Sequence, residues 1–113
     1  MQVLFVSRHP LAAEFRALSE QRIRFALRRL AWRVPRAEVQ LSDLNGPKGG
    51  LDKRCQIALR TDGAGTVVVA SVARHWRTAL DQALARAARF LVRQWRRTHE
   101  HGRQRQRPQR DER

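Results

Sequence analysis

The sequence has little of what several large classes of protein require. Its single cysteine, Cys55, excludes an intramolecular disulfide framework and any metal site built from several cysteines. No apolar run approaches the roughly 18 residues needed to span a bilayer, and the first residues lack the basic segment and cleavage site of a secretory signal. Acidic residues number only 10 among 113. We therefore expect one small, soluble, cytoplasmic domain.

Positive charge is what the sequence has in excess. Arginine supplies 22 of the 24 basic residues, and the net charge is +14. Guanidinium groups bind phosphate bidentately and stack on bases, so this composition favours a nucleic-acid partner. A GC-rich genome would also raise the ratio of arginine to lysine, but it would not explain the net charge.

The charge is concentrated in the segments that flank the middle of the chain. Residues 8–33 and 74–100 each carry a net charge of +5, whereas residues 36–73 carry +1. The last segment, residues 101–113, carries a net charge of +3. It is rich in arginine and glutamine and has no apolar side chain other than that of Pro108. We expect a domain over residues 1–100 followed by a disordered basic tail over 101–113.

The apolar pattern predicts the element order β-α-β-β-β-α. Helical spacing of Leu11, Phe15, Leu18, Ala26 and Leu30 indicates a helix over 11–31, and a second helical pattern runs from about 75 to 99. Apolar runs or alternation predict strands over 3–6, 37–43, 54–60 and 66–72. Because the last three strands have one apolar face, both helices should cover that face. The expected fold is α+β: a two-layer sandwich with a four-stranded mixed sheet, similar to a double-stranded-RNA-binding domain.

The second helix carries the most informative pattern. Its apolar residues, from Trp76 to Trp95, fall on one broad arc. Five arginines fall on the opposite arc: Arg86, Arg89, Arg93, Arg96 and Arg97. Like charges three and four residues apart repel, and a surface that serves only solubility interleaves both signs. The row therefore favours phosphate binding.

The first helix adds arginines in a less regular pattern. Arg22 and Arg29 lie toward the edge of its apolar face, where they could cover the sheet with their alkyl stems or point into a groove between the helices. We favour the groove. Phe15, Trp76 and Trp95 are expected in the core, whereas Phe25 and Phe90 fall off the apolar arcs and are candidates for stacking on bases.

No arrangement of residues indicates catalysis, a metal or a cofactor. Gly46-Pro47-Lys48-Gly49 joins two strands and so lacks the context of a KH clamp, although its backbone amides and Lys48 offer a weak anion site. His99 and His101 do not share a helical face. Asp81 is expected to bond a nearby backbone group or arginine, and Cys55 to be a buried thiol. We predict a protein that is not an enzyme.

The stretch from Ser42 to Cys55, Ser-Asp-Leu-Asn-Gly-Pro-Lys-Gly-Gly-Leu-Asp-Lys-Arg-Cys, resembles the strand-loop-strand of the ribosome hibernation-promoting factors. These proteins are also called ribosome-associated inhibitors or sigma-54 modulation proteins. Ala79-Leu80-Asp81 and the basic residues that follow are similar to the family's final helix. The resemblance covers about residues 2–100. Arg77 stands where the family usually has an aromatic residue, with Trp76 one place earlier.

The resemblance implies a partner, the small ribosomal subunit and its rRNA, and a site in the channel that holds mRNA and tRNA. Occupation of that channel would inhibit translation in stationary phase or stress. Neither a membrane nor a small-molecule substrate is implied. The chain would be a short form that needs a separate ribosome-dimerising factor or holds single ribosomes inactive. The rRNA-binding residues carried over are Arg22, Arg28, Arg86, Arg89, Arg93 and Arg97, and the helical arcs alone add Arg24, Arg29 and Arg96.

Two other classes of function stay open on the sequence. A general double-stranded-RNA-binding module would bind any A-form duplex through its shape and phosphates. A protein-binding modulator of transcription, as the sigma-factor name suggests, would leave the arginine row without a role.

Overall fold

The computed structural model describes residues 1–7, 9–44, 52–63 and 65–106, with side chains as far as residue 97. Four strands form one sheet: β1 (Gln2–Phe5), β2 (Arg36–Asp43), β3 (Lys53–Thr61) and β4 (Gly65–Ala73). Two α-helices and two short 3₁₀ helices complete the chain: η1 (Pro10–Phe15), α1 (Arg16–Ala26), η2 (Ala31–Arg33) and α2 (Trp76–Gln106).

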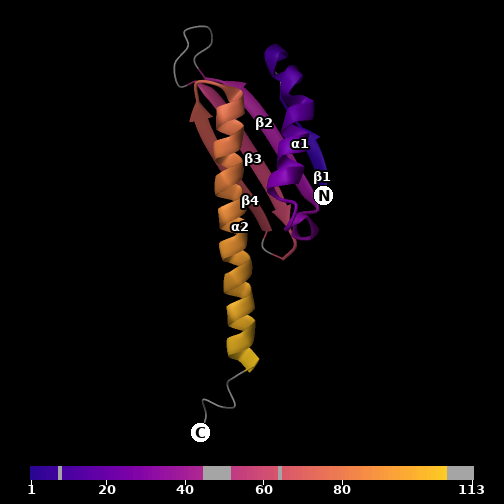
Figure 1. Cartoon of the computed structure of the whole chain (residues 1–113), viewed down its shortest axis with the longest axis vertical. Helices are drawn as coiled ribbons and strands as arrows, with labels where there is room; N and C mark the ends of the chain where they lie inside the picture. The colour runs from indigo at the N-terminus through magenta and orange to yellow at the C-terminus, as the bar shows by residue number, and fades with distance from the viewer. Residues whose placement is uncertain (8, 45–51, 64, 107–113) are drawn as a thin grey trace.

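The strands lie in the order β1-β2-β3-β4, so each strand pairs with its neighbour in the chain. β1 is parallel to β2, which requires the crossover that α1 provides, and the other two pairs are antiparallel. Figure 1 shows α1 and α2 side by side on the same face of the sheet. The predicted α+β fold, with its mixed sheet and one covered face, is confirmed.

The core lies between this sheet face and the two helices. Alternate residues of β3, from Cys55 to Leu59, are fully buried and pair with buried residues of β2. Small residues of α2, such as Ala79, Ala83 and Ala87, are buried too, so the helix backbone approaches the sheet closely. The intervening strand residues face the opposite, uncovered side. Burial of alternate residues thus fixes which face of the sheet the helices occupy.

The predicted helix over 11–31 is wrong in its extent. The α-helix spans only Arg16–Ala26, preceded by the 3₁₀ turns of η1 and followed by tight turns that reach η2. Backbone bonds three residues apart run from Arg28 to Val34, for example from the Leu30 amide to the Leu27 carbonyl. These turns place both Leu27 and Val34 in the core with no exposed surface. Leu11, expected on the buried face, is 61% exposed because it belongs to η1.

The last helix is longer than predicted. α2 contains 31 residues, a length of about 46 Å at 1.5 Å per residue, and it continues past the end of the sheet. Residues 101–106 were expected to belong to a disordered tail, but their backbone continues the helix. Residues 107–113 lie outside the described residues. The boundary of the domain at residue 100 stays a prediction.

Candidate nucleic-acid interface

A groove runs between α1 and α2 on the side of the helices away from the sheet. It consists of two hollows of about 470 and 540 Å³, which share Ala26 and Ala88 and so adjoin each other. Small side chains at these two positions keep the helices from filling the space between them. We refer to the two parts as the Asp81 hollow and the Trp95 hollow.

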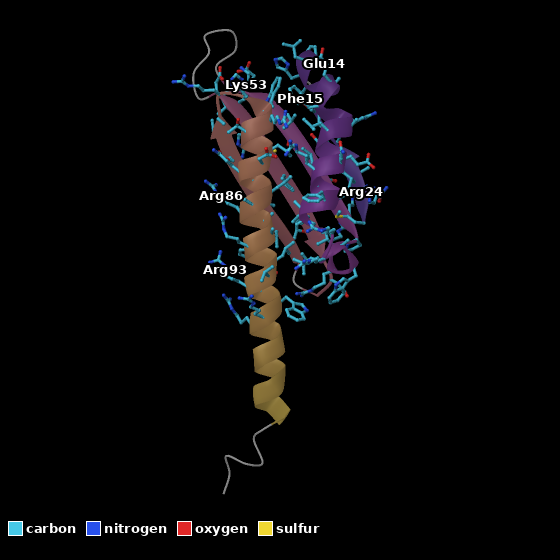
Figure 2. The ribbon with its side chains drawn as sticks, viewed as in Figure 1. Glu14, Phe15, Arg24, Lys53, Arg86 and Arg93 are labelled. Carbon is cyan, nitrogen blue, oxygen red and sulfur yellow. The ribbon has the colours of Figure 1, made fainter. Side chains whose placement is uncertain are left out.

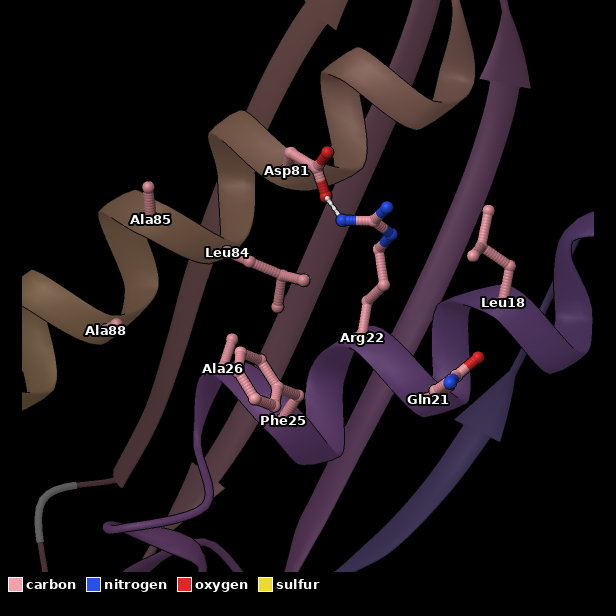
Figure 3. A pocket seen from close by; sticks show the side chains of 9 residues that line it. All are labelled: Leu18, Gln21, Arg22, Phe25, Ala26, Asp81, Leu84, Ala85 and Ala88. Carbon is pink, nitrogen blue, oxygen red and sulfur yellow. Dashed lines mark hydrogen bonds and ion pairs between the residues drawn. The ribbon is translucent and has the colours of Figure 1, made fainter.

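The Asp81 hollow contains an ion pair that links the helices. Arg22 Nη1 donates to Asp81 Oδ1 at 3.0 Å, and Phe25 and Leu84 form apolar walls beside the pair (Figure 3). Both charged side chains stay partly exposed to solvent. The expectation that Asp81 bonds an arginine is confirmed, and Arg22 points into the groove as favoured above.

The Trp95 hollow combines positive charge with two indole rings. Arg28 and Arg29, from the turns after α1, and Arg96, from α2, line it together with Trp32 and Trp95. Arg28 Nη1 also donates to the Phe25 carbonyl at 2.9 Å, and its guanidinium lies 4.3 Å from the centre of the Phe25 ring. No carboxylate lines this hollow among the residues that the structure describes.

The arginine row of α2 divides between two sides of the helix. Arg96 faces the Trp95 hollow, whereas Arg86 Nη1 donates to the carbonyl of Ala70 in β4 at 2.7 Å. Figure 2 shows Arg86 and Arg93 on the side of α2 away from α1. Arg89, Arg93 and Arg97 are exposed and bond none of the described side chains. All five arginines of the row are exposed, as expected, and Arg86 is in addition bonded to the edge of the sheet.

Arg24 lies apart from the other candidate residues. Its Nε is 3.1 Å from Glu20 Oε2, and its Nη1 donates to the Met1 carbonyl at 3.0 Å. Figure 2 shows it on the side of α1 away from α2. Of the nine predicted rRNA-binding residues, the structure therefore brings Arg22, Arg28, Arg29 and Arg96 together in the groove and leaves Arg24 outside it.

The aromatic residues are distributed differently from the prediction. Trp76 is buried as expected, with Phe15 against it, and both Phe25 and Phe90 are exposed. Trp95 is only half-buried and lines the groove, so its expected place in the core is wrong. Trp32 is 66% exposed, and the sequence pattern did not single it out as a stacking candidate. Trp32 lies within tight turns, so helical periodicity says nothing about its exposure. The only indication in the sequence is that this large apolar residue has arginines on both sides.

A polar cluster fixes the end of the sheet where β2 and β3 flank residues 45–51. Lys53 Nζ lies 3.0 Å from Asp43 Oδ2 and 3.2 Å from Asp52 Oδ1, and hydrogen bonding to Asp43 raises the lysine's pKa. Trp76 Nε1 donates to the Ser42 carbonyl at 3.0 Å beside this cluster. These contacts are structural. Lys48 and the Gly46–Gly49 loop lie outside the described residues, as do the side chains of His99 and His101.

Burial determines the chemistry of the only thiol. Cys55 is fully buried between the sheet and the helices, and burial raises its pKa to about 12. The expected buried thiol is confirmed. Among the described residues, no group of three or more histidines, cysteines and carboxylates could hold a metal ion, and no helix is long and apolar enough to cross a membrane.

Comparison with known proteins identifies a structural relative. No protein-family profile matches the chain, and no curated protein sequence matches it significantly. The structure is similar to the crystal structure of the Thermus thermophilus Protein Y N-terminal domain, with a TM-score of 0.66. The match is 24% identical in sequence and covers 82% of this chain and 98% of that domain. The two proteins share a fold.

Proposed function

We propose that this protein binds the small ribosomal subunit in the cytoplasm, in the channel for mRNA and tRNA, and inhibits translation during stress or stationary phase. In this proposal α1 and α2 contact rRNA phosphates through their arginines. The two helices form one face of the molecule, so a single binding event can engage both. No catalytic step is involved.

The observation that carries the proposal is the excess of unpaired positive charge on the helical face of the molecule. Carboxylates pair with Arg22 and Arg24 there, as Glu38 pairs with Arg36 on the uncovered face of the sheet. On the helices, Arg89, Arg93 and Arg97 bond none of the described side chains. Asp81 is the only carboxylate lining the described part of the groove. Such a surface attracts phosphate and favours rapid, salt-sensitive association with RNA.

The choice of ribosomal RNA over other RNA rests on two resemblances. The strand-loop-strand and final helix resemble those of the hibernation factors, and the fold is that of the Protein Y domain, which is grouped with the ribosome hibernation proteins. Both support a ribosome-associated role. Neither identifies the contacts, so these are assigned from the charged helices described above.

Co-sedimentation tests the proposal directly. The full chain is centrifuged with purified small subunits in the presence of excess random duplex RNA. The salt concentration is ~100 mM, at which phosphate contacts still contribute strongly to affinity. We expect the protein to remain with the subunit. Loss to the duplex would instead identify a general double-stranded-RNA binder, and weak binding to both would favour a protein partner.

A pair of matched variants locates the contact surface. Arg89→Ala/Arg93→Ala removes two charges from α2, and Arg54→Ala/Arg60→Ala removes two from the uncovered face of the sheet. We expect the first variant alone to reduce the slope of log affinity against log salt by about two, since each lost phosphate contact lowers it by roughly one. Equal effects of the two variants would show that overall charge, rather than the helical face, determines binding.

A further inference from the structure

The Trp95 hollow has features that phosphate binding alone does not require. Trp32 is 66% exposed, although tryptophan buries more apolar surface than any other side chain and is usually largely buried. Trp95 lines the same hollow from the opposite helix, and Leu30 and Val92 add apolar surface beside them. Two indole rings that line one hollow place apolar surface within a strongly cationic face.

The arginines around this patch restrict what can occupy it. Arg28, Arg29 and Arg96 line the hollow, and Arg33 lies with its guanidinium 5.8 Å from the centre of the Trp32 ring. These charges oppose a second copy of this chain, which is itself strongly basic. An occupant needs a flat apolar group for the indoles and negative charge for the guanidiniums. An unpaired nucleotide has both, because its base stacks on aromatic rings while its phosphates bind arginine.

We propose that the Trp95 hollow binds a single unpaired RNA base, stacked on Trp32 and Trp95, while Arg28, Arg29 and Arg96 bind the adjoining phosphates. The inference rests on the proposed function in that it takes RNA as the partner. It adds a site for an extruded base to a surface otherwise assigned to backbone phosphates. A volume of about 540 Å³ admits one base and its ribose.

The hollow is open to such a base without rearrangement of the helices. Small residues, Ala26 and Ala88, form its boundary with the Asp81 hollow. The ion pair of Arg22 with Asp81 links α1 and α2 beside it. The walls are therefore set by the fold before RNA binds, which reduces the entropy lost on binding.

The test compares two RNA hairpins that differ only in one base. Both contain a single-nucleotide bulge, which is adenosine in one and an abasic ribose in the other, so they carry the same number of phosphates. We expect the full chain to bind the adenosine hairpin roughly 5- to 100-fold more tightly, the range expected for stacking of one base. Equal affinity for the two hairpins, or binding to neither at low salt, would overturn the inference.

Variants assign the discrimination to the hollow. Trp32→Ala should abolish the preference for adenosine and retain affinity for the abasic hairpin, and Trp32→Phe should restore part of the preference. Val68→Ala is the matched control, because Val68 is an exposed apolar residue on the uncovered face of the sheet and does not line the hollow. A preference that survives both Trp32→Ala and the double variant Trp32→Ala/Trp95→Leu would place the base elsewhere and overturn the inference.

Two further readouts separate this inference from its alternatives. Stacking on an indole quenches its fluorescence, so the adenosine hairpin should quench Trp32 and Trp95 while the buried Trp76 keeps its emission. Quenching of equal strength by a polyglutamate peptide would indicate an acidic protein partner and overturn the base site. Retention on the small subunit without discrimination between hairpins would overturn this inference and leave the proposed function intact.

Discussion

Arg22 and Asp81 join the two helices across the groove, with Arg22 Nη1 3.0 Å from Asp81 Oδ1. The two residues are 59 positions apart in the chain, and each side chain is about one-third to one-half exposed. An ion pair this accessible to water contributes at most about 1 kcal/mol to stability. Its larger effect is on charge, because it neutralises one arginine of a surface that binds RNA in our proposal.

Asp81→Asn should therefore change stability and RNA affinity in opposite directions. The free energy of unfolding should fall by less than about 1 kcal/mol, whereas affinity for RNA should rise severalfold because a negative charge leaves the groove and Arg22 becomes available. Thermal denaturation and binding of the adenosine-bulge hairpin measure the two effects. Glu20→Gln is the matched control: it also frees an arginine, Arg24, but outside the groove. An equal gain from both variants would mean that net charge alone is responsible.

Trp76→Phe should be strongly destabilising. The change removes the hydrogen bond from Nε1 to the Ser42 carbonyl and opens space beside Phe15, whose ring centre lies 5.6 Å from that of Trp76. The partly buried Ser42 carbonyl would lose this partner, so we expect the free energy of unfolding to fall by about 2–3 kcal/mol. Chemical denaturation measures this value. Trp32→Phe, at an exposed position, should cost less than about 0.5 kcal/mol.

Cys55 should make the protein less stable at alkaline pH. Burial raises the pKa of this thiol from 9.0 to about 12, so the unfolded chain loses the thiol proton first as the pH rises. The resulting loss of stability begins near pH 9 and continues until the pH reaches the folded pKa. At pH 10 it is on the order of 1 kcal/mol relative to neutral pH. Denaturation of the wild type and Cys55→Ala across this range measures it, and parallel curves for the two proteins would contradict the assignment.

Gly63→Ala should destabilise the β3–β4 hairpin through the backbone alone. Gly63 has φ of 88°, a conformation that L-residues rarely adopt, yet a methyl group there would meet no atom within 4 Å. We expect a loss of about 1 kcal/mol in the free energy of unfolding, without a change in RNA affinity. Asp62→Ala, at the preceding residue, is the comparison, because no positive φ is required there. A Gly63→Ala protein as stable as the wild type would show that the turn adapts.

The strands were predictable because each buries one face. Alternation from Cys55 to Leu59 gave both the strand and its orientation, and each predicted strand lies within about a residue of the observed one. The region around α1 was not predictable in the same way. Its periodicity suits a helix to residue 31, but burial of both Leu27 and Val34 requires tight turns instead. Tertiary packing determined the end of this helix.

The sequence predicted which residues form the candidate site better than it predicted how they are arranged. Helical periodicity identified the arginines of α2, but it could not show that the edge of β4 would engage Arg86. Nor could it show that Trp32, which follows no helical pattern, lines the same hollow as Trp95. Contacts between residues far apart in the chain decide these features, and a single sequence does not specify them.

The hydrogen bond from Arg86 to Ala70 bears on the solubility of the protein. β4 is an edge strand of nine residues, with Val68 and Val72 exposed on its uncovered face. Such an edge is a template for pairing with another chain and for aggregation. The Arg86 guanidinium donates a hydrogen bond to a carbonyl in the middle of β4 and places a positive charge beside this strand. A residue whose sequence pattern suggests RNA binding thus also keeps copies of the protein from joining sheet to sheet at high concentration.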